Sequence, residues 1–206
     1  MRRKTHRIIE LIYDILGTGG TSLYGDVDTK YAHQGAISSV NTNYMILHDI
    51  FKNVSVNKDD VFVDIGCGKG RLFAYLRLRR LCKRMIGIEL DKDVAQIAQK
   101  WSKHFKGIEI LSGDVREVFP PDGTIYYLFN PFSASVLEDF LKLAEKDCSL
   151  GITLIYCNID ASREEVFRAR SAYWSLEKQF VASTKYHDVK NSVYPTHVYK
   201  LKAKTQ

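Results

Sequence analysis

The 206-residue chain carries 30 Lys and Arg against 24 Asp and Glu, a formal net charge of +6, and is 45% hydrophobic and 26% charged. This composition excludes a largely disordered chain, and the length predicts one compact domain. No apolar run approaches the roughly 18 residues that span a bilayer, which excludes an ordinary transmembrane helix. The modest basic excess favours anionic partners at low salt, although a solvated basic face is the simpler interpretation.

The four cysteines, Cys67, Cys82, Cys148 and Cys157, form no C-x-x-C pair. Neither a zinc ribbon nor a redox motif is therefore expected, and no metal site is predicted. Scattered cysteines of this kind are typical of a reduced, cytoplasmic protein.

The first 17 residues have a basic head and an apolar stretch, as a secretory signal does, but Glu10 and Asp14 interrupt the stretch and no cleavage site follows. An amphipathic helix that ends at Gly17 fits better, and its apolar positions recur at helical spacing: Ile8, Ile9, Leu11, Ile12, Ile15 and Leu16. We interpret it as a helix that packs on the domain. The alternative is that its basic flank meets a membrane surface or a partner.

Residues 17–40 are polar and rich in glycine, without clear periodicity. A stretch of this length is either a functional lid or a poorly ordered connector. We therefore divide the chain into residues 1–40, an N-terminal helix with a lid-like segment, and residues 41–206, the main part of one compact domain. Asn41 or Thr42 is expected to cap a helix whose core-facing residues are Met45, Ile46, Ile50 and Phe51.

The motif VFVDIGCGKGR, residues 61–71, is an apolar strand followed by three alternate glycines and a helix. Glycine permits positive φ and close backbone approach, and the helix points its first amides at a ligand. Strands and helices alternate in the rest of the chain, with strand-like runs at 84–89, 108–111, 124–129, 151–157, 174–183 and 193–202. This order predicts a doubly wound, Rossmann-like, mostly parallel sheet of seven strands with helices on both faces and an antiparallel C-terminal edge strand.

Ligands of such sheets bind at the carboxyl ends of the strands, where this chain has Asp64, Glu89, Asp114 and Asn130. Glu89 suits the two hydroxyls of a ribose, and Asp114 suits an adenine amine. A nicotinamide site is the competing interpretation, but its fingerprint needs a glycine where Arg71 stands.

These motifs resemble those of the class I S-adenosylmethionine-dependent methyltransferases: DIGCGKG at 64–70, GIELD at 87–91, GDV at 113–115 and FNPF at 129–132. The resemblance extends from residue 41 to the C-terminus and implies S-adenosyl-L-methionine as the cofactor. It implies a cofactor site made of Asp64, Gly66, Cys67, Gly68, Gly70, Glu89, Leu90, Asp114, Val115 and Asn130.

Asn130, Pro131 and Phe132 resemble the [D/N]-P-P-[Y/F] signature of methyltransferases that act on amino groups, and they are the predicted catalytic residues. One proline is missing, which leaves the acceptor atom open between nitrogen, oxygen and carbon. The structural alternative is that Pro131 only ends a strand before Ser133 caps a helix. If an alcohol is the acceptor, His33, His187 or Tyr44 would have to assist its deprotonation.

The sequence thus predicts a methyltransferase that aligns donor and acceptor for in-line transfer. A small molecule is the expected acceptor because no second recognition domain is visible, with protein or nucleic acid as the alternative because of the basic surface. A binding module that keeps the cofactor pocket without turnover is the rival from another class. The sequence does not indicate an oligomeric state.

Overall fold

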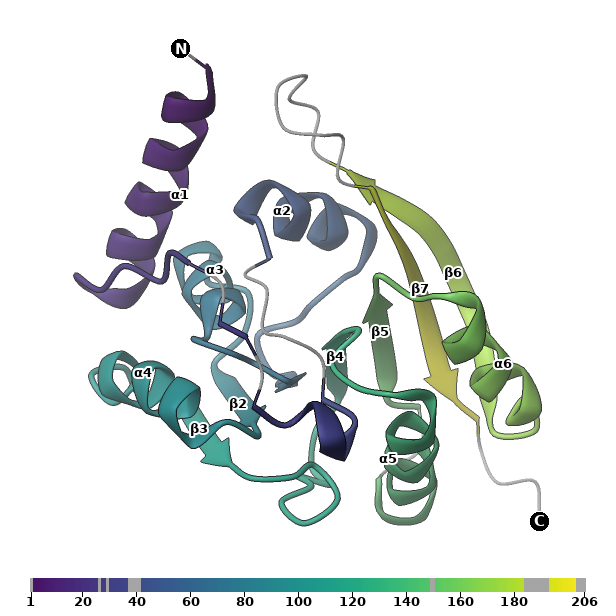
Figure 1. Ribbon diagram of the computed structural model, residues 1–206. Coiled ribbons are helices and arrows are strands. Elements are labelled where there is room, and N and C mark those ends of the chain that lie inside the picture. The colour runs from purple at the N-terminus through teal and green to yellow at the C-terminus, as the bar shows by residue number, and fades with distance from the viewer. Residues whose placement is uncertain are drawn as a thin grey trace.

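The computed structural model describes residues 2–25, 27–28, 30–36, 42–148, 151–183 and 193–202. Its centre is a seven-stranded sheet in the order β3-β2-β1-β4-β5-β7-β6 (Figure 1). The strands are β1 Val61–Ile65, β2 Arg84–Glu89, β3 Ile108–Ser112, β4 Ile125–Phe129, β5 Thr153–Cys157, β6 Trp174–Ser183 and β7 Val193–Leu201. The predicted doubly wound fold is confirmed.

Strands β1 to β5 run parallel, and β7 is antiparallel to both of its neighbours. The C-terminal strand lies between β5 and β6, so that β6, although earlier in the chain, forms the edge of the sheet. The strand order reverses beside β1, between β1 and β4. In doubly wound sheets this switch point opens the crevice in which ligands bind.

Five helices cover the two faces of the sheet and explain why its central strands are apolar on both sides. One core joins the sheet to α2 Tyr44–Asn53, α3 Arg71–Arg79 and α4 Lys92–Ser102, and the other joins it to α5 Ala134–Asp147 and α6 Ala161–Ala169. None of the helices in the described part of the chain is long and apolar enough to cross a membrane.

Side-chain caps set the start of most of these helices. Asp91 caps α4 and Ser133 caps α5, as the sequence predicts. The predicted cap of α2 is wrong: Asn43, in extended conformation, accepts from the amide of Met45 at 2.7 Å. Thr42 precedes this cap, and Asn41 lies outside the described residues. An N-cap must have its oxygen two or three residues before a free amide, and Asn43 meets that condition here.

Helix α2 faces the core with Tyr44, Ile46, Leu47 and Ile50, whereas Met45 and Phe51 are only partly buried. Ile46 and Ile50 are thus confirmed as core-facing residues, whereas Tyr44 and Leu47 were not predicted to be. Phe51 still stacks on Tyr75 of α3 at a ring separation of 5.5 Å.

Helix α1, Arg2–Thr18, packs on α3, as interpreted from the sequence, but it does so with the side that carries its two acids. Glu10 and Asp14 are buried, at 5% and 0% exposure. The apolar residues are 38% to 59% exposed: Ile8, Leu11, Ile12, Ile15 and Leu16. The reason is the Arg71 guanidinium at the start of α3, which draws both carboxylates inward.

Candidate functional site

The glycine loop, residues 66–70, directly follows β1 and lies against the end of β2. The amides of Gly66 and Cys67 both donate to the Ile88 carbonyl, at 2.8 and 2.9 Å. Gly66, Gly68 and Gly70 have φ of 77°, 55° and 83°, the left-handed region that favours glycine. A Cβ on Gly66 would lie 2.7 Å from the Cβ of Pro131, so the loop can only pass Pro131 as glycine.

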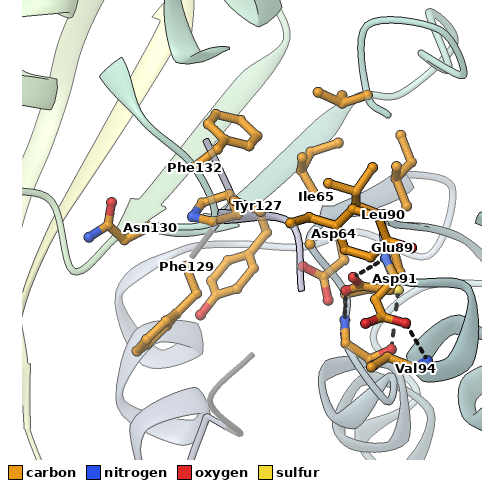
Figure 2. A pocket seen from close by; sticks show the side chains of 18 of the residues that line it. Asp64, Ile65, Glu89, Leu90, Asp91, Val94, Tyr127, Phe129, Asn130 and Phe132 are labelled. Atoms are coloured by element: carbon orange, nitrogen blue, oxygen red, sulfur yellow. Dashed lines mark hydrogen bonds between the residues drawn. The ribbon is translucent and has the colours of Figure 1, made fainter. Parts of the chain in front are cut away.

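Asp64, the penultimate residue of β1, and Glu89, the last residue of β2, lie side by side at the pocket (Figure 2). Asp64 is 4% exposed, and among the described residues its carboxylate receives no hydrogen bond. Burial, and then the charge of Glu89, raises the pKa of Asp64 well above its ordinary value. A buried carboxylate of this kind gains most from a cationic partner.

Glu89 is held in place by two backbone amides. Its Oε2 accepts from Gly68 and its Oε1 from Asp91, both at 2.9 Å. Burial nevertheless raises the pKa of Glu89, and the two hydrogen bonds oppose that rise. Glu89 therefore connects the glycine loop rigidly to the end of β2.

Asp114 follows β3 and is held by its own loop. Its carboxylate accepts from Arg116 Nε at 2.9 Å and from a second guanidinium nitrogen at 2.5 Å. The hydrogen bond from Arg116 is the main cause that lowers the pKa of Asp114. Asp114 lines the pocket as an anion with one face already paired.

Asn130 lies on the opposite side of the pocket from Glu89 (Figure 2). Its φ is 43°, and its Oδ1 accepts from the hydroxyl of Tyr156 at 3.1 Å. Burial raises the pKa of Tyr156, which keeps this hydroxyl a donor. The neighbouring strand end repeats the conformation, since Asn158 after β5 has φ of 59° and also lines the pocket.

Phe132 anchors the next residues. Its carbonyl accepts from Arg163 at 2.9 Å, and it pairs with Ala36 in an isolated β-bridge. The Ser133 amide also donates to the Gly35 carbonyl at 2.8 Å. The segment around residues 35 and 36 is therefore bound directly to the predicted catalytic residues.

The pocket brings together all but one of the residues predicted for the site. Gly70 is the exception: it is the N-cap of α3 and does not line the pocket, and a Cβ there would meet Trp101 at 2.9 Å. Of the candidate bases, Tyr44 is buried against Asp14 and does not line the pocket, and His33 lines an adjoining groove. His187 lies outside the described residues.

Sequence reasoning missed several pocket residues. Tyr127 and Phe129 of β4 line the pocket, as do Val27, Asp28, Tyr31 and Ala36 of the N-terminal segment. The rule that strand ends carry ligand sites would have found Asn158. From the sequence, the aromatic residues of β4 are predicted only as core residues. The N-terminal segment has no periodicity, so which of its residues line the pocket could not be predicted.

Arg71 carries the most extensive missed interaction. Its guanidinium binds Glu10 at 2.9 Å and Asp14 at 3.0 Å, and all three side chains are at most 8% exposed. Asp14 also accepts from the Leu23 amide and the Tyr44 hydroxyl. Arg71 lines the pocket, so this network connects α1 to the first residue after the glycine loop.

Comparison with known proteins agrees with this geometry. Residues 29–114 match the family model "Histone methylation protein DOT1". A ribosomal RNA small subunit methyltransferase A of Clostridium acetobutylicum is 31% identical over 77 residues, which are 37% of this chain and 27% of that protein. The H3 lysine-79 specific histone-lysine N-methyltransferase of Caenorhabditis elegans is 35% identical over 65 residues, 32% of this chain and 7% of that protein.

Among solved structures, an RNA methyltransferase of Salinibacter ruber in complex with S-adenosyl-L-homocysteine has a TM-score of 0.59 at 20% identity, covering 81% of this chain and 97% of that one. TrmN of Thermus thermophilus has a TM-score of 0.62 at 15% identity and covers 84% and 51%. These likenesses establish the fold.

The fold, the order of the strand-end motifs and these matches agree, and together they support a class I S-adenosylmethionine-dependent methyltransferase. The chain spans well under half the length of the curated relatives that it matches, 38% and 27% for the first two. The activity and the acceptor are therefore matters for proposal.

Proposed function

We propose that the chain transfers a methyl group from S-adenosylmethionine to an amino nitrogen of RNA, an adenine being the favoured base. The observation that carries the proposal is that Asn130, Pro131 and Phe132 line the same pocket as the glycine loop and Glu89. The donor residues and the acceptor residues then face one space, which is what an in-line transfer requires.

The residues present fit the cofactor. Asp64, buried and without a hydrogen bond from the described residues, would meet the ammonium group of the methionine moiety, and Glu89 would accept from the ribose hydroxyls. Gly66 leaves room at Pro131 that a side chain would fill. When bound, the cofactor supplies a methyl group already made electrophilic by its sulfonium.

The acceptor side needs orientation more than proton abstraction. Asn130 is not a base, but its Oδ1 keeps a second lone pair beside the Tyr156 hydrogen bond and would accept an N–H of the incoming amine. The hydroxyl of Tyr156 fixes the amide orientation. An amino nitrogen held this way would direct its lone pair toward the donor, which supports nitrogen over oxygen as the acceptor atom.

The relatives support a polymer rather than the small molecule expected from the sequence. The matched curated proteins include an rRNA adenine N-6-methyltransferase of Limosilactobacillus reuteri, 23% identical over 96 residues, and the ribosomal RNA methyltransferases named above. The net charge of +6 suits a polyanion. A protein lysine is the second candidate, favoured by the match to the DOT1 model.

Transfer of tritiated methyl from S-adenosylmethionine to purified ribosomal RNA, transfer RNA or histones tests the proposal. We expect label in RNA, recovered as methyladenosine after digestion to nucleosides. Asn130→Gly should lower the rate at least about tenfold, because it removes the side chain while glycine tolerates the positive φ.

Arg80→Gly is the matched control, since Arg80 also has a positive φ, 53°, and does not line the pocket. Equal activity of both variants with the wild type would remove Asn130 from the mechanism. Label in histones alone would assign the lysine acceptor. Tight binding of S-adenosylhomocysteine with no transfer to any acceptor would favour the binding module.

A further inference from the structure

Helix α1 exposes an apolar face that the described part of the chain does not cover. The face consists of Ile8, Leu11, Ile12, Ile15 and Leu16, each 38% to 59% exposed. Single exposed apolar residues are ordinary, but five on one side of one helix form a contiguous patch. We call these five residues the α1 face.

The α1 face is exposed because the ion network of Arg71 is buried, and not because the helix packs loosely. Glu10 and Asp14 are turned inward to Arg71, and Asp14 further accepts from the amide of Leu23. Rotating the helix to bury the isoleucines would leave the Arg71 guanidinium buried without a partner, which is costly. The apolar side is therefore held outward.

The sequence of α1 is basic apart from its two buried acids. Glu10 and Asp14 are the only acids of α1, and both are buried, while Arg2, Arg3, Lys4 and Arg7 lie in its first two turns. Arg77 covers the other end, donating to the carbonyls of Leu16 and Gly17 at 2.6 and 2.7 Å. The N-terminal part of α1 extends beyond α3 (Figure 1).

We propose that the α1 face docks on an anionic lipid bilayer surface, lying in the interface with its aliphatic side chains inserted. An aliphatic stripe with basic residues and no exposed acid is the pattern of interfacial helices. Residues 7–18 of α1, whose side chains the structure describes, do not line the pocket, so the docked protein keeps its site open. The inference goes beyond the proposed function.

A second copy of the chain fits this face less well. Five half-exposed side chains offer on the order of 500 Å² per copy, so a pair would bury about 1,000 Å², less than the roughly 1,200 to 2,000 Å² of a stable interface. A parallel pair would bring the basic N-terminal turns together, and an antiparallel pair would bring each of them to Arg77 of the other copy. RNA is not favoured, because the face offers no aromatic ring for bases.

Co-sedimentation of the full chain with vesicles tests the proposal. We expect binding to vesicles of phosphatidylcholine with phosphatidylglycerol, weaker binding to phosphatidylcholine alone, and loss of binding as salt is raised. Ile8→Glu and Ile12→Glu should each lower the partition coefficient by about tenfold or more. Both positions are exposed, so the melting temperature should not change.

Val181→Glu is the matched control, because Val181 is an exposed apolar residue of β6, 57% exposed, away from α1. It should sediment like the wild type. Failure of the wild type to sediment with anionic vesicles, or equal sedimentation of Ile12→Glu, overturns the proposal. A concentration-dependent dimer that Ile12→Glu abolishes would assign the face to a second copy instead.

Discussion

Glu10 is a carboxylate that folding places beside another carboxylate and one guanidinium. Its Oε2 lies 2.9 Å from Arg71, and its Oε1 accepts from the Tyr44 amide at 3.1 Å. Burial is the main cause that raises the pKa of Glu10 to about 7, and the Arg71 charge only partly opposes it. With Asp14 bound to the same guanidinium, one positive charge faces two acids.

The pKa of Glu10 predicts that the chain loses stability as pH rises from about 4.5 to about 7. In this window the folded state holds a proton that the unfolded state has released, so raising the pH favours unfolding. The loss should be on the order of 1 to 3 kcal/mol and should level off above pH 7. Denaturant unfolding followed at pH 5 and pH 8 measures it.

Glu10→Gln should flatten this dependence, because an amide does not titrate and still accepts a hydrogen bond. Asp93→Asn is a suitable control, since Asp93 pairs with Lys30 on the surface. A pH profile of Glu10→Gln as steep as that of the wild type would show that another group carries the effect.

At the level of elements, α1 shows that the sequence pattern of an amphipathic helix does not by itself decide which side of the helix is buried. The spacing of Ile8, Leu11, Ile12 and Ile15 predicts an apolar side correctly, yet the partner helix α3 presents Arg71. Leaving a buried guanidinium without a charged or polar partner costs more free energy than leaving isoleucines exposed, so the polar side of α1 faces inward.

The strand-to-helix turn after β1 depends on Gly66 for two reasons: its φ of 77° and the 2.7 Å approach that a Cβ would make to Pro131. Gly66→Ala is therefore expected to weaken S-adenosylhomocysteine binding by more than about tenfold and to destabilise the fold by about 1 to 3 kcal/mol. Calorimetric titration and denaturant unfolding measure the two effects.

Gly151→Ala separates the two causes, because Gly151 has φ of 83° but open space around its Cβ position. It should cost only the backbone strain, about 1 kcal/mol, and leave ligand affinity unchanged. If Gly66→Ala behaves like Gly151→Ala in both measurements, the contact with Pro131 is not what excludes a side chain.

At the level of the whole molecule, the site joins segments far apart in the chain. Four residues of the N-terminal segment (27, 28, 31 and 36), the ends of five strands and the start of α3 contribute to one pocket. Lys69 of the glycine loop also donates to the Gly25 carbonyl at 2.7 Å. A ligand that contacts these segments together should stabilise the whole domain.

S-Adenosylhomocysteine at about a hundred times its dissociation constant is expected to add about 2.7 kcal/mol, which raises the melting temperature by about 5 to 10 °C. Glu89→Gln should remove most of this shift, because the ribose would lose its anionic acceptor and only one of the Gly68 and Asp91 amides would keep an oxygen to donate to. Thermal unfolding with and without the ligand measures the effect.

Glu117→Gln serves as the control for that experiment, since Glu117 is an exposed acid outside the pocket. It should shift like the wild type. A full thermal shift in Glu89→Gln would contradict the assignment of Glu89 to the cofactor.

The sequence by itself determined the succession of strands and helices along the chain, the glycine turn and the acids at the strand ends. These features are local: a run of buried residues, the φ that only glycine adopts readily, and polar residues where a strand stops. Because parallel strands end at one edge, correct identification of the strands is enough to bring Asp64, Glu89, Asp114 and Asn130 to one pocket.

Only the tertiary structure decided which side of α1 is buried, that Tyr156 holds Asn130, and that Gly70 packs on Trp101 instead of lining the pocket. Each depends on what another element presents at the point of contact. Arg71 is 57 residues from Asp14, and Tyr156 is 26 residues from Asn130. The periodicity of one segment does not predict such contacts, because their free energy depends on both residues of each pair.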